Sequence, residues 1–383
     1  MERAHIAVFV SQHPPSLIPT LPIVATLVRR GHRVSFVTSP RFRQRVETTG
    51  SDIVECENYP NTNVTDVLDW NEETLASSRK WLQADRPDLI LYELFNFGGL
   101  VLAREWNIPS VQVSPLFALD RDHFTQQTEN HEWHRILVEI AEEFEALMKK
   151  HGIDTDFFFH RDALNIFYYP RAFQRPGNAF DESCFYAGSC AGDQPRIGSW
   201  QNKLAGKKPI VLVSASTTYP QGLSHFRMCI EALAPLSVHT VVCLGDRSDI
   251  SPADLEAPNV EVVQRVSLVH ILESASLFIC QGGNQSVSEA TYYGVPLIFL
   301  TKGSLDLEWH ANHYARLGIG LHLKGRETTV VHIRAAACET LEGTRIKQRV
   351  AEMQRIMWQE PNSDQTAQRI ERHLAESRAA TSA

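Results

Sequence analysis

His5-Ile6-Ala7-Val8-Phe9-Val10 is an apolar run near the start of the chain, typical of a strand buried on both faces. A loop with two prolines is expected over Ser11–Ile18, and a helix over Pro19–Arg30 with Pro19 in its first turn. Gly31 ends that helix, and Arg33-Val34-Ser35-Phe36-Val37-Thr38 is predicted to be a second strand. Strand, helix and strand in this order predict a βαβ unit, the start of a parallel sheet covered by helices.

The same alternation continues to the end of the chain. Further strands are expected over residues 89–92, 110–113, 209–214, 238–244, 260–263, 276–280 and 296–300. Further helices are expected over residues 100–106, 131–150, 225–234, 268–274, 286–293 and 363–377. Residues 188–208, rich in Gly, Pro, Ser, Asp and Lys, are the expected linker. The pattern predicts an α/β protein with two doubly wound domains, residues 1–200 and 209–360, followed by a helix and tail over 361–383.

Composition excludes several classes of protein. The 383 residues are 43% hydrophobic and 21% charged, which fits a globular chain of two domains. A net charge of −8 without a basic run argues against nucleic-acid binding, and no apolar stretch predicts a membrane span. The first residues lack the features of a secretory signal, and the seven cysteines are scattered. We therefore expect a cytoplasmic protein with reduced thiols that binds no membrane.

The segment most informative about ligand binding is Cys280-Gln281-Gly282-Gly283-Asn284-Gln285-Ser286-Val287-Ser288-Glu289. It joins a buried strand to a helix, and its two glycines allow close backbone approach to an anion at the helix N-terminus. We call residues 280–286 the diphosphate cradle. The competing interpretation is an ordinary tight turn between strand and helix. Neither GxGxxG nor GxxxxGK[ST] occurs, so a dinucleotide oxidoreductase or P-loop protein has no support.

An ordered series of motifs resembles the macrolide-type branch of the inverting GT-B glycosyltransferases of family one. In the second half the series comprises residues 262–268, 281–290, 292–296, 306–307 and 317–320; in the first half it comprises residues 5–7, 31–34, 87–93 and 108–111. The resemblance spans essentially the whole chain. It implies two Rossmann-like domains facing across a cleft, with the acceptor bound by the N-terminal domain and a nucleotide-sugar by the C-terminal domain. It also implies no metal, and a C-terminal helix that returns to the first domain.

The resemblance also implies which residues contact the donor. They are Ser216, Thr217, Arg265, Val266, Leu268, Gln281, Gly282, Gly283, Gln285, Ser286, Glu289, Asp306 and Leu307. Arg265 stands where the family commonly has an aromatic platform for the base. Leu268 replaces a Gln typical of UDP users and looks more like members that use dTDP-sugars. Asp306-Leu307 replaces an acidic–Gln pair that reads sugar hydroxyls, and an apolar Leu307 would suit a deoxysugar.

The position of the catalytic base departs most from the family pattern. Counting back from Gly31 places Ser16 where the family has its catalytic His, and His13 is the nearest imidazole. Glu93 stands where the family has the Asp that orients that His. Three alternatives remain open: His13 reaches in as the base, Glu93 acts directly or through water, or catalysis is weakened. Without a catalytic role, His13 would be a solvated loop residue and Ser16 a helix cap.

The sequence thus predicts transfer of a sugar from a UDP- or dTDP-sugar to a hydroxyl of a small, largely apolar acceptor such as a secondary metabolite. The nucleotide-sugar is a co-substrate, and no cofactor is expected. Phe95, Phe117 and Phe124 are candidates for an apolar acceptor pocket, although core packing is the commoner role of such residues. Asp154-Thr155-Asp156 formally matches a DxD metal motif but is interpreted as a turn. The alternatives are a nucleotide-sugar epimerase of the same shape, or a non-catalytic donor-binding or partner protein.

Overall fold

The computed structural model describes residues 3–60, 64–119, 121, 124, 131–174, 180–194, 196, 198–202, 208–215, 221–245, 247, 249–264, 266–301, 305–325 and 327–382. The chain divides into two compact units. Unit 1 comprises Met1–Pro195 together with Glu360–Ala383, and unit 2 comprises Arg196–Gln359. No helix among the described residues is both long and apolar enough to span a bilayer.

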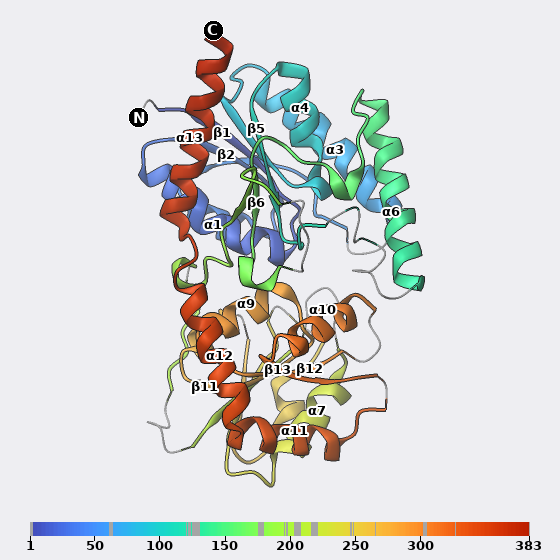
Figure 1. The fold of residues 1–383 in the computed structure, drawn as a ribbon, viewed down its shortest axis with the longest axis vertical. Coiled ribbons are helices and arrows are strands. Elements are labelled where there is room, and N and C mark those ends of the chain that lie inside the picture. Colours follow the sequence, from blue (N-terminus) through green and yellow to red (C-terminus); the bar gives the residue numbers. More distant parts are fainter. Residues whose placement is uncertain are drawn as a thin grey trace. The chain divides into compact units, whose positions relative to one another are not determined.

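Unit 1 is built on a parallel sheet of seven strands in the order β3-β2-β1-β4-β5-β6-β7 (Figure 1). The strands are β1 His5–Phe9, β2 Arg33–Thr38, β3 Asp52–Glu55, β4 Leu89–Tyr92, β5 Ser110–Ser114, β6 Asn165–Phe167 and β7 Cys184–Tyr186. The strand order reverses between β1 and β4, where ligands of doubly wound sheets usually bind. The structure confirms the expected fold class. The sequence pattern did not predict β3, β6 and β7.

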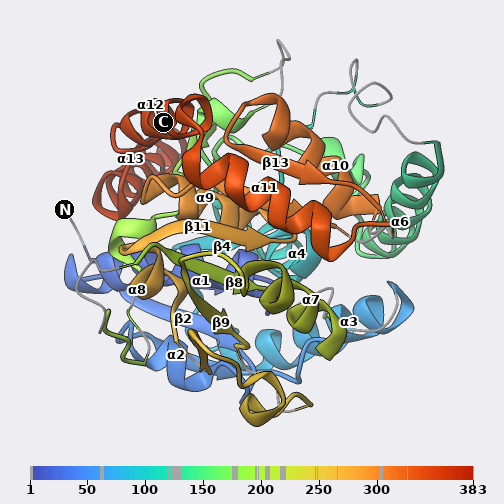
Figure 2. The ribbon, with the colours of Figure 1, turned by 90° about the horizontal axis from the view of Figure 1, so that it is seen from below.

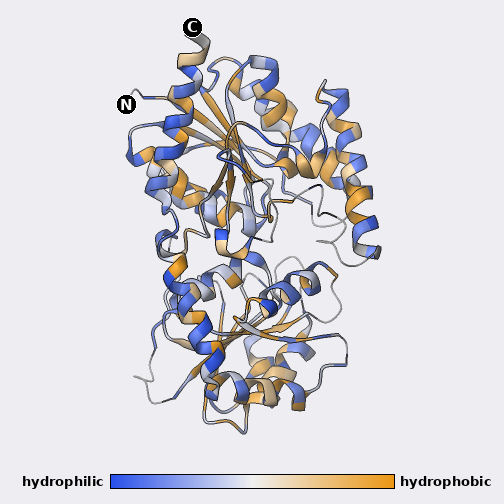
Figure 3. Ribbon diagram, viewed as in Figure 1, coloured by the Kyte–Doolittle hydropathy of each residue, from blue (hydrophilic) through white to orange (hydrophobic). Residues whose placement is uncertain are grey.

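Helices cover both faces of this sheet. One face carries α1 Pro14–Arg29, α2 Arg43–Glu47 and α13 Ser363–Ser382. The other carries α3 Val64–Leu82, α4 Gly98–Trp106, α6 His131–Lys150 and the short turn η3 Phe157–Phe159. Figure 3 shows the apolar strands between helices whose outer faces are hydrophilic. Strands buried on both faces have few polar side chains, so a polar residue within them is notable.

The prediction for the first helix is wrong at its start. Helix α1 begins at Pro14, not Pro19, and His13 is its N-cap residue. Pro14 and Pro15 occupy the first turn, where a missing N–H costs no hydrogen bond. Pro19 therefore lies inside the helix. The consecutive prolines were interpreted as a loop, although they are compatible with a helix start.

The C-terminal helix packs within unit 1, as the fold prediction expected. Helix α13 lies beside α1 (Figure 1) and ends at Ser382, beyond the predicted end at residue 377. The buried Glu371 carboxylate accepts two hydrogen bonds from the Arg30 guanidinium, at 2.8 and 2.7 Å, and lies 3.0 Å from His32 Nε2. Asp193 accepts hydrogen bonds from the backbone N–H and hydroxyl of Ser363 at the start of the helix.

Unit 2 contains a second parallel sheet, in the order β10-β9-β8-β11-β12-β13. Its strands are β8 Ile210–Ser214, β9 His239–Cys243, β10 Val260–Val263, β11 Ala275–Cys280, β12 Leu297–Leu300 and β13 Gly320–Leu323. Its helices are α7 Leu223–Leu233, α8 Leu268–Leu272, α9 Asn284–Tyr292, α10 Leu305–Arg316, α11 Val330–Glu342 and α12 Thr344–Met357. Helices α7 and α11 pack together on one face of the sheet (Figure 2), whereas α9 contacts α8 and α12.

Candidate active site

The diphosphate cradle lies at the carboxyl end of β11, a central strand of unit 2. Gly282 has φ +89°, a conformation that L side chains rarely adopt, and Gly283 caps the nine-residue helix α9. The helix begins at Asn284, two residues before the predicted start. A Cβ atom on Gly283 would meet no atom within 4 Å. The cradle therefore presents the helix N-terminus, with its unsatisfied N–H groups, beside open space.

Helix α10 supports the cradle from behind. A Cβ atom on Gly282 would lie 3.3 Å from Cβ of Ala311, so only glycine fits without displacement. The fully buried Tyr314 donates its hydroxyl to Oδ1 of Asn284 at 2.6 Å. Both contacts hold the first residues of α9 in place, which gives the cradle a fixed shape before any ligand binds.

Two glutamines predicted to contact the donor lie in the interior. Gln281 is buried, and Gln285 donates from Nε2 to Oε1 of Glu289 at 2.7 Å, one turn along α9. Glu289 is buried as well, whereas Ser286 is only partly buried. This hydrogen bond joins the Gln285 and Glu289 side chains across one turn of α9. Ser286, by contrast, is partly buried beside the first backbone N–H groups of α9.

The predicted sugar-reading pair lies at the start of α10. Asp306 Oδ1 lies 3.2 Å from Nε2 of His310, one helical turn away, and its side chain is partly exposed. Leu307 is only 3% exposed and packs in the interior of unit 2, away from the exposed face of Asp306. Val266 and Leu268 are half-buried at the start of α8. Ser216, Thr217 and Arg265 lie outside the described residues.

The candidate base region of unit 1 combines residues from two strand ends. Glu93 directly follows β4 and is 2% exposed. Its Oε2 accepts hydrogen bonds from the Ser11 backbone N–H at 2.8 Å and from the Ser11 hydroxyl at 2.6 Å. The Ser11 and Ser16 hydroxyl oxygens lie 3.0 Å apart, and a Ser16 hydroxyl contact also lowers the Glu93 pKa. Burial outweighs these hydrogen bonds, and the pKa of Glu93 is raised.

Ser11 is a site residue that the sequence analysis missed. The signal available was its place two residues after β1, whose last residue Phe9 pairs with Tyr92, the residue before Glu93. Ser16 is buried in the first turn of α1 and does not cap the helix, because His13 holds that position. Ser16 thus contacts the same carboxylate that the family resemblance pairs with the catalytic His.

His13 has a different environment from Ser16. Its ring packs edge-on against Tyr59, with ring centroids 4.7 Å apart, and Tyr59 in turn packs against Trp70. Burial, and then the nearby charge of Arg41, lower the pKa of His13 to about 4. The imidazole is therefore neutral at neutral pH and only partly buried. No hydrogen bond joins it to Glu93 among the described contacts.

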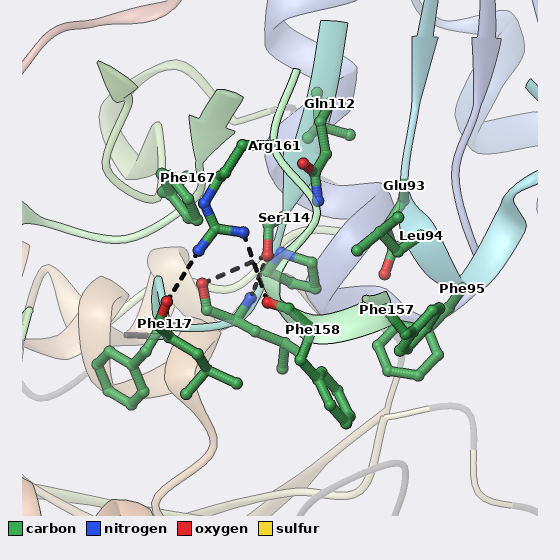
Figure 4. A pocket seen from close by; sticks show the side chains of 14 residues that line it. Glu93, Leu94, Phe95, Gln112, Ser114, Phe117, Phe157, Phe158, Arg161 and Phe167 are labelled. Atoms are coloured by element: carbon green, nitrogen blue, oxygen red, sulfur yellow. Dashed lines mark hydrogen bonds between the residues drawn. The ribbon is translucent and has the colours of Figure 1, made fainter. Parts of the chain in front are cut away.

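A pocket lies at the carboxyl ends of β4 and β5 in unit 1 (Figure 4). Its walls are mainly apolar, and Phe95 and Phe117, both predicted to bind the acceptor, line it. Phe124 does not; its ring packs on His134 and Phe159. The pocket holds about 390 Å³ of space when its open mouth is counted, and a cavity of about 30 Å³ for ordered water. That cavity has room for about two waters.

The DxD match is part of the local structure of unit 1. Asp156 caps the turn η3 and forms an ion pair with Arg121. Within the described ranges, no three His, Cys, Asp or Glu side chains gather in a metal-binding arrangement. Residues 154–156 are irregular chain that leads into η3 rather than the expected turn, and the backbone of Asp156 is extended.

Comparisons with known proteins agree with this architecture. The family described as "Erythromycin biosynthesis protein CIII-like, C-terminal domain" matches residues 227–373. NDP-glycosyltransferase YjiC of Bacillus licheniformis is 28% identical over 400 residues, covering 98% of this chain and 99% of that enzyme. Oleandomycin glycosyltransferase of Streptomyces antibioticus is 29% identical over 396 residues, covering 97% and 91% respectively.

Solved structures show the same likeness. The glycotransferase of kitacinnamycin superposes with a TM-score of 0.83 at 26% identity, covering 97% of this chain and 100% of that one. The calicheamicin glycosyltransferase CalG4 superposes with a TM-score of 0.80 at 25% identity, covering 98% and 99%. Sequence and fold therefore agree along the full length: the chain has the GT-B fold and is similar from end to end to glycosyltransferases of the family-one, antibiotic type.

Proposed function

We propose that this protein transfers a sugar from a UDP- or dTDP-sugar to a hydroxyl of a small, largely apolar secondary metabolite, with inversion and without a metal. Relatives named for oleandomycin and demethyllactenocin support a natural-product acceptor. The aromatic pocket of unit 1 supports an apolar acceptor, since such pockets bind mainly through buried apolar surface.

Inversion requires one displacement, in which the acceptor oxygen attacks the anomeric carbon while a base removes its proton. The observation that carries this proposal is the hydrogen-bonded chain from Ser16 through Ser11 to Glu93. The acceptor proton passes to the Ser16 oxygen, directly or through one water, as the Ser16 proton moves to the Ser11 oxygen and the Ser11 proton moves to the Glu93 carboxylate. A buried carboxylate with a raised pKa is a stronger base than an ordinary one.

His13 is the competing base. It is less buried than Ser16, but a pKa near 4 makes it a weak proton acceptor at neutral pH. Its packing against Tyr59 also leaves it without a carboxylate partner to stabilise the imidazolium, among the contacts described. We therefore assign the role of general base to Glu93. His13 is the alternative base, and mutation of each residue distinguishes them.

Departure of the nucleoside diphosphate is assisted by the cradle. Backbone N–H groups at the start of α9 and the Ser286 hydroxyl stabilise the charge that develops on the leaving oxygen. This stabilisation needs no metal ion. The ion pair between Asp156 and Arg121 supports metal independence, because it engages one carboxylate of the DxD match.

The test is a transfer assay with UDP-glucose and dTDP-glucose and a panel of phenols and macrolide aglycones. Turnover is expected to survive a chelator, and the α-linked donor is expected to give a β-linked product by NMR. An α-linked product would contradict inversion, and loss of turnover with the chelator would contradict metal independence. Donor binding without transfer or donor hydrolysis would instead identify a binding protein.

The nucleotide preference has its own measurement. Leu268 stands where UDP users typically have Gln, so dTDP should raise the melting temperature at least as much as UDP. A clear shift with UDP and none with dTDP would rule out this inference from Leu268.

A further inference from the structure

Gln112 is a polar residue in the middle of a strand that is otherwise buried and apolar. On β5, Val111 and Val113 face the core beneath α1 and α13. Because side chains alternate along a strand, Gln112 faces the opposite side, toward α3, α4 and α6. Its register partner on β4 is Tyr92, the residue before Glu93. Gln112 is therefore next to the base region and borders the same pocket.

The amide oxygen of Gln112 is buried without a hydrogen-bond partner among the described residues. The side chain is 3% exposed, and its Oε1 makes no hydrogen bond with any residue that the structure describes. In Figure 4 the amide points from the strand into the space bordered by the phenylalanines. A buried amide oxygen that lacks a partner is destabilising, and native proteins rarely retain one without a function.

The other polar groups of the pocket already have partners. Arg161 donates to the carbonyl oxygens of His160 and Leu119, at 2.7 and 3.1 Å, and its guanidinium lies over the Phe167 ring. Ser114 Oγ accepts the Leu116 backbone N–H, and the Glu93 carboxylate accepts from Ser11. Among the described polar side chains of this pocket, Gln112 is thus the one with a buried oxygen atom that has no hydrogen-bond partner.

We propose that Gln112 determines acceptor specificity by hydrogen bonding a second polar substituent of the acceptor. This inference rests on the proposed function. The acceptor is an apolar, ring-containing molecule whose reacting hydroxyl lies toward Glu93 and whose second hydroxyl reaches Gln112. A hydroxyl suits the amide in either orientation, because it can donate to Oε1 or accept from Nε2. The cavity of about 30 Å³ fits such a substituent, while the ring occupies the wider mouth between the phenylalanines.

One test measures stability and needs no substrate. Gln112→Leu removes the unpartnered amide, so the melting temperature of the ligand-free protein is expected to stay equal or rise. Gln194→Leu is the matched control, because Gln194 is 9% exposed and donates to the Ser189 carbonyl at 3.0 Å. The control is expected to lower the melting temperature. A decrease in Gln112→Leu as large as in the control would overturn the proposal, since Gln112 would then be a satisfied structural residue.

The second test measures acceptor selectivity with 2-naphthol and naphthalene-2,7-diol, which differ by one distal hydroxyl. With UDP-glucose or dTDP-glucose as donor, the wild type is expected to favour the diol by about tenfold or more in kcat/KM after correction for its two equivalent hydroxyls. Gln112→Leu, and Gln112→Met as a second apolar variant, should bring this ratio close to one. Gln194→Leu should leave it unchanged.

The outcomes distinguish a failure of the role proposed for Gln112 from a failure of the proposed function. Sugar transfer to naphthols without a diol preference, or with a preference that survives in both Gln112 variants, overturns the role of Gln112 and leaves the proposed function standing. If the wild type transfers sugar to no acceptor in the broader panel, the proposed function fails and this inference fails with it.

Discussion

The donor cradle in unit 2 and the base region in unit 1 are built in opposite ways. The cradle is one continuous segment, residues 280–286, and its functional groups are largely backbone N–H groups at a helix start. The base region brings Ser11 from the β1–α1 connection and Ser16 from the first turn of α1 to Glu93, 82 residues from Ser11 along the chain. Backbone chemistry is local and tolerates changes of side chain. Side-chain chemistry depends on distant residues meeting, so a single substitution can rearrange it.

This difference explains why the two regions depart unequally from the family pattern. In the cradle, the glycines and the helix start supply the proposed anion site through the backbone, whatever side chain stands at residue 281. In unit 1, Ser16 stands where the family resemblance places the catalytic His, and we propose that the Glu93 carboxylate serves in its place. The first prediction addresses that replacement, because it has the largest expected effect.

Glu93→Gln is expected to lower turnover by roughly 10²–10⁴-fold, the usual range for loss of a general base. His13→Ala should change turnover only a few-fold, since its imidazole is a weak base. Steady-state kinetics with a true acceptor measures both variants. A large loss in His13→Ala with a mild one in Glu93→Gln would transfer the role to His13.

The same variant has a stability signature. Burial raises the pKa of Glu93 in the folded state, so wild-type stability declines as pH rises from about 4.5 through the folded pKa. Gln cannot ionise, so the stability of Glu93→Gln should not decline in this way. Between low and neutral pH the variant should lose less stability than the wild type does. Denaturant unfolding at several pH values would show whether the two curves diverge in that direction.

The cradle offers a matched pair of variants. Gly282→Ala must place a side chain at φ +89° and 3.3 Å from Ala311, so it should lower stability by about 1–2 kcal/mol and weaken donor binding. Gly283→Ala has φ −64° and open space around its Cβ, so only the poorer N-cap preference of alanine should lower its stability, by about 1 kcal/mol or less. Its added methyl group should still weaken dTDP or UDP binding by about tenfold, or ~1.4 kcal/mol. Calorimetry measures the nucleotide affinity of both variants. Unchanged affinity in Gly283→Ala would indicate that residues 280–286 are an ordinary turn.

Variants of the C-terminal helix α13 are expected to change the stability of unit 1 without changing ligand binding in unit 2. Glu371→Gln should destabilise the protein by about 1–3 kcal/mol, because it weakens charge-assisted hydrogen bonds from Arg30 to a buried carboxylate. Glu376→Gln on the same helix is the control. Glu376 is 59% exposed and 3.8 Å from Arg369, so its loss should cost at most about 1 kcal/mol. The nucleotide-induced shift in melting temperature should be the same in both variants.

The smallest expected effect concerns His13 and pH. Its folded pKa, about 4, lies below the ordinary value of 6.5, so the unfolded chain binds a proton first as pH falls. Stability from this residue is present above about pH 6.5 and is lost as pH falls toward 4. Removing it in His13→Ala should flatten that loss by about 1–2 kcal/mol, an amount reduced by the partial exposure of the ring. Urea unfolding at about pH 7.5 and about pH 4.5, on either side of most of this window, gives the difference.

Periodicity and punctuation in the sequence identified most central strands and the alternation of strand and helix. Helix α6 was placed correctly at both ends, His131 and Lys150, because its amphipathic pattern is long. The short strands β3, β6 and β7 and the start of α1 were missed or misplaced. Strands β6 and β7 have only three residues, and β3 begins and ends with an acidic residue, so none of them carries the apolar run of a predicted strand such as Leu89–Tyr92. Prolines 14 and 15 favour a loop as much as a helix start.

The sequence by itself determined the features that depend on local chemistry: two doubly wound domains, a cradle of glycines at a helix start, and a missing imidazole at residue 16. Only the tertiary structure decided which side chains meet. It brought Ser11 to Glu93, oriented Gln285 toward Glu289 on the same helix, and placed Gln112 in a pocket among phenylalanines. Such contacts arise between segments far apart in the chain, or depend on a rotamer that packing selects, and neither can be derived from spacing alone.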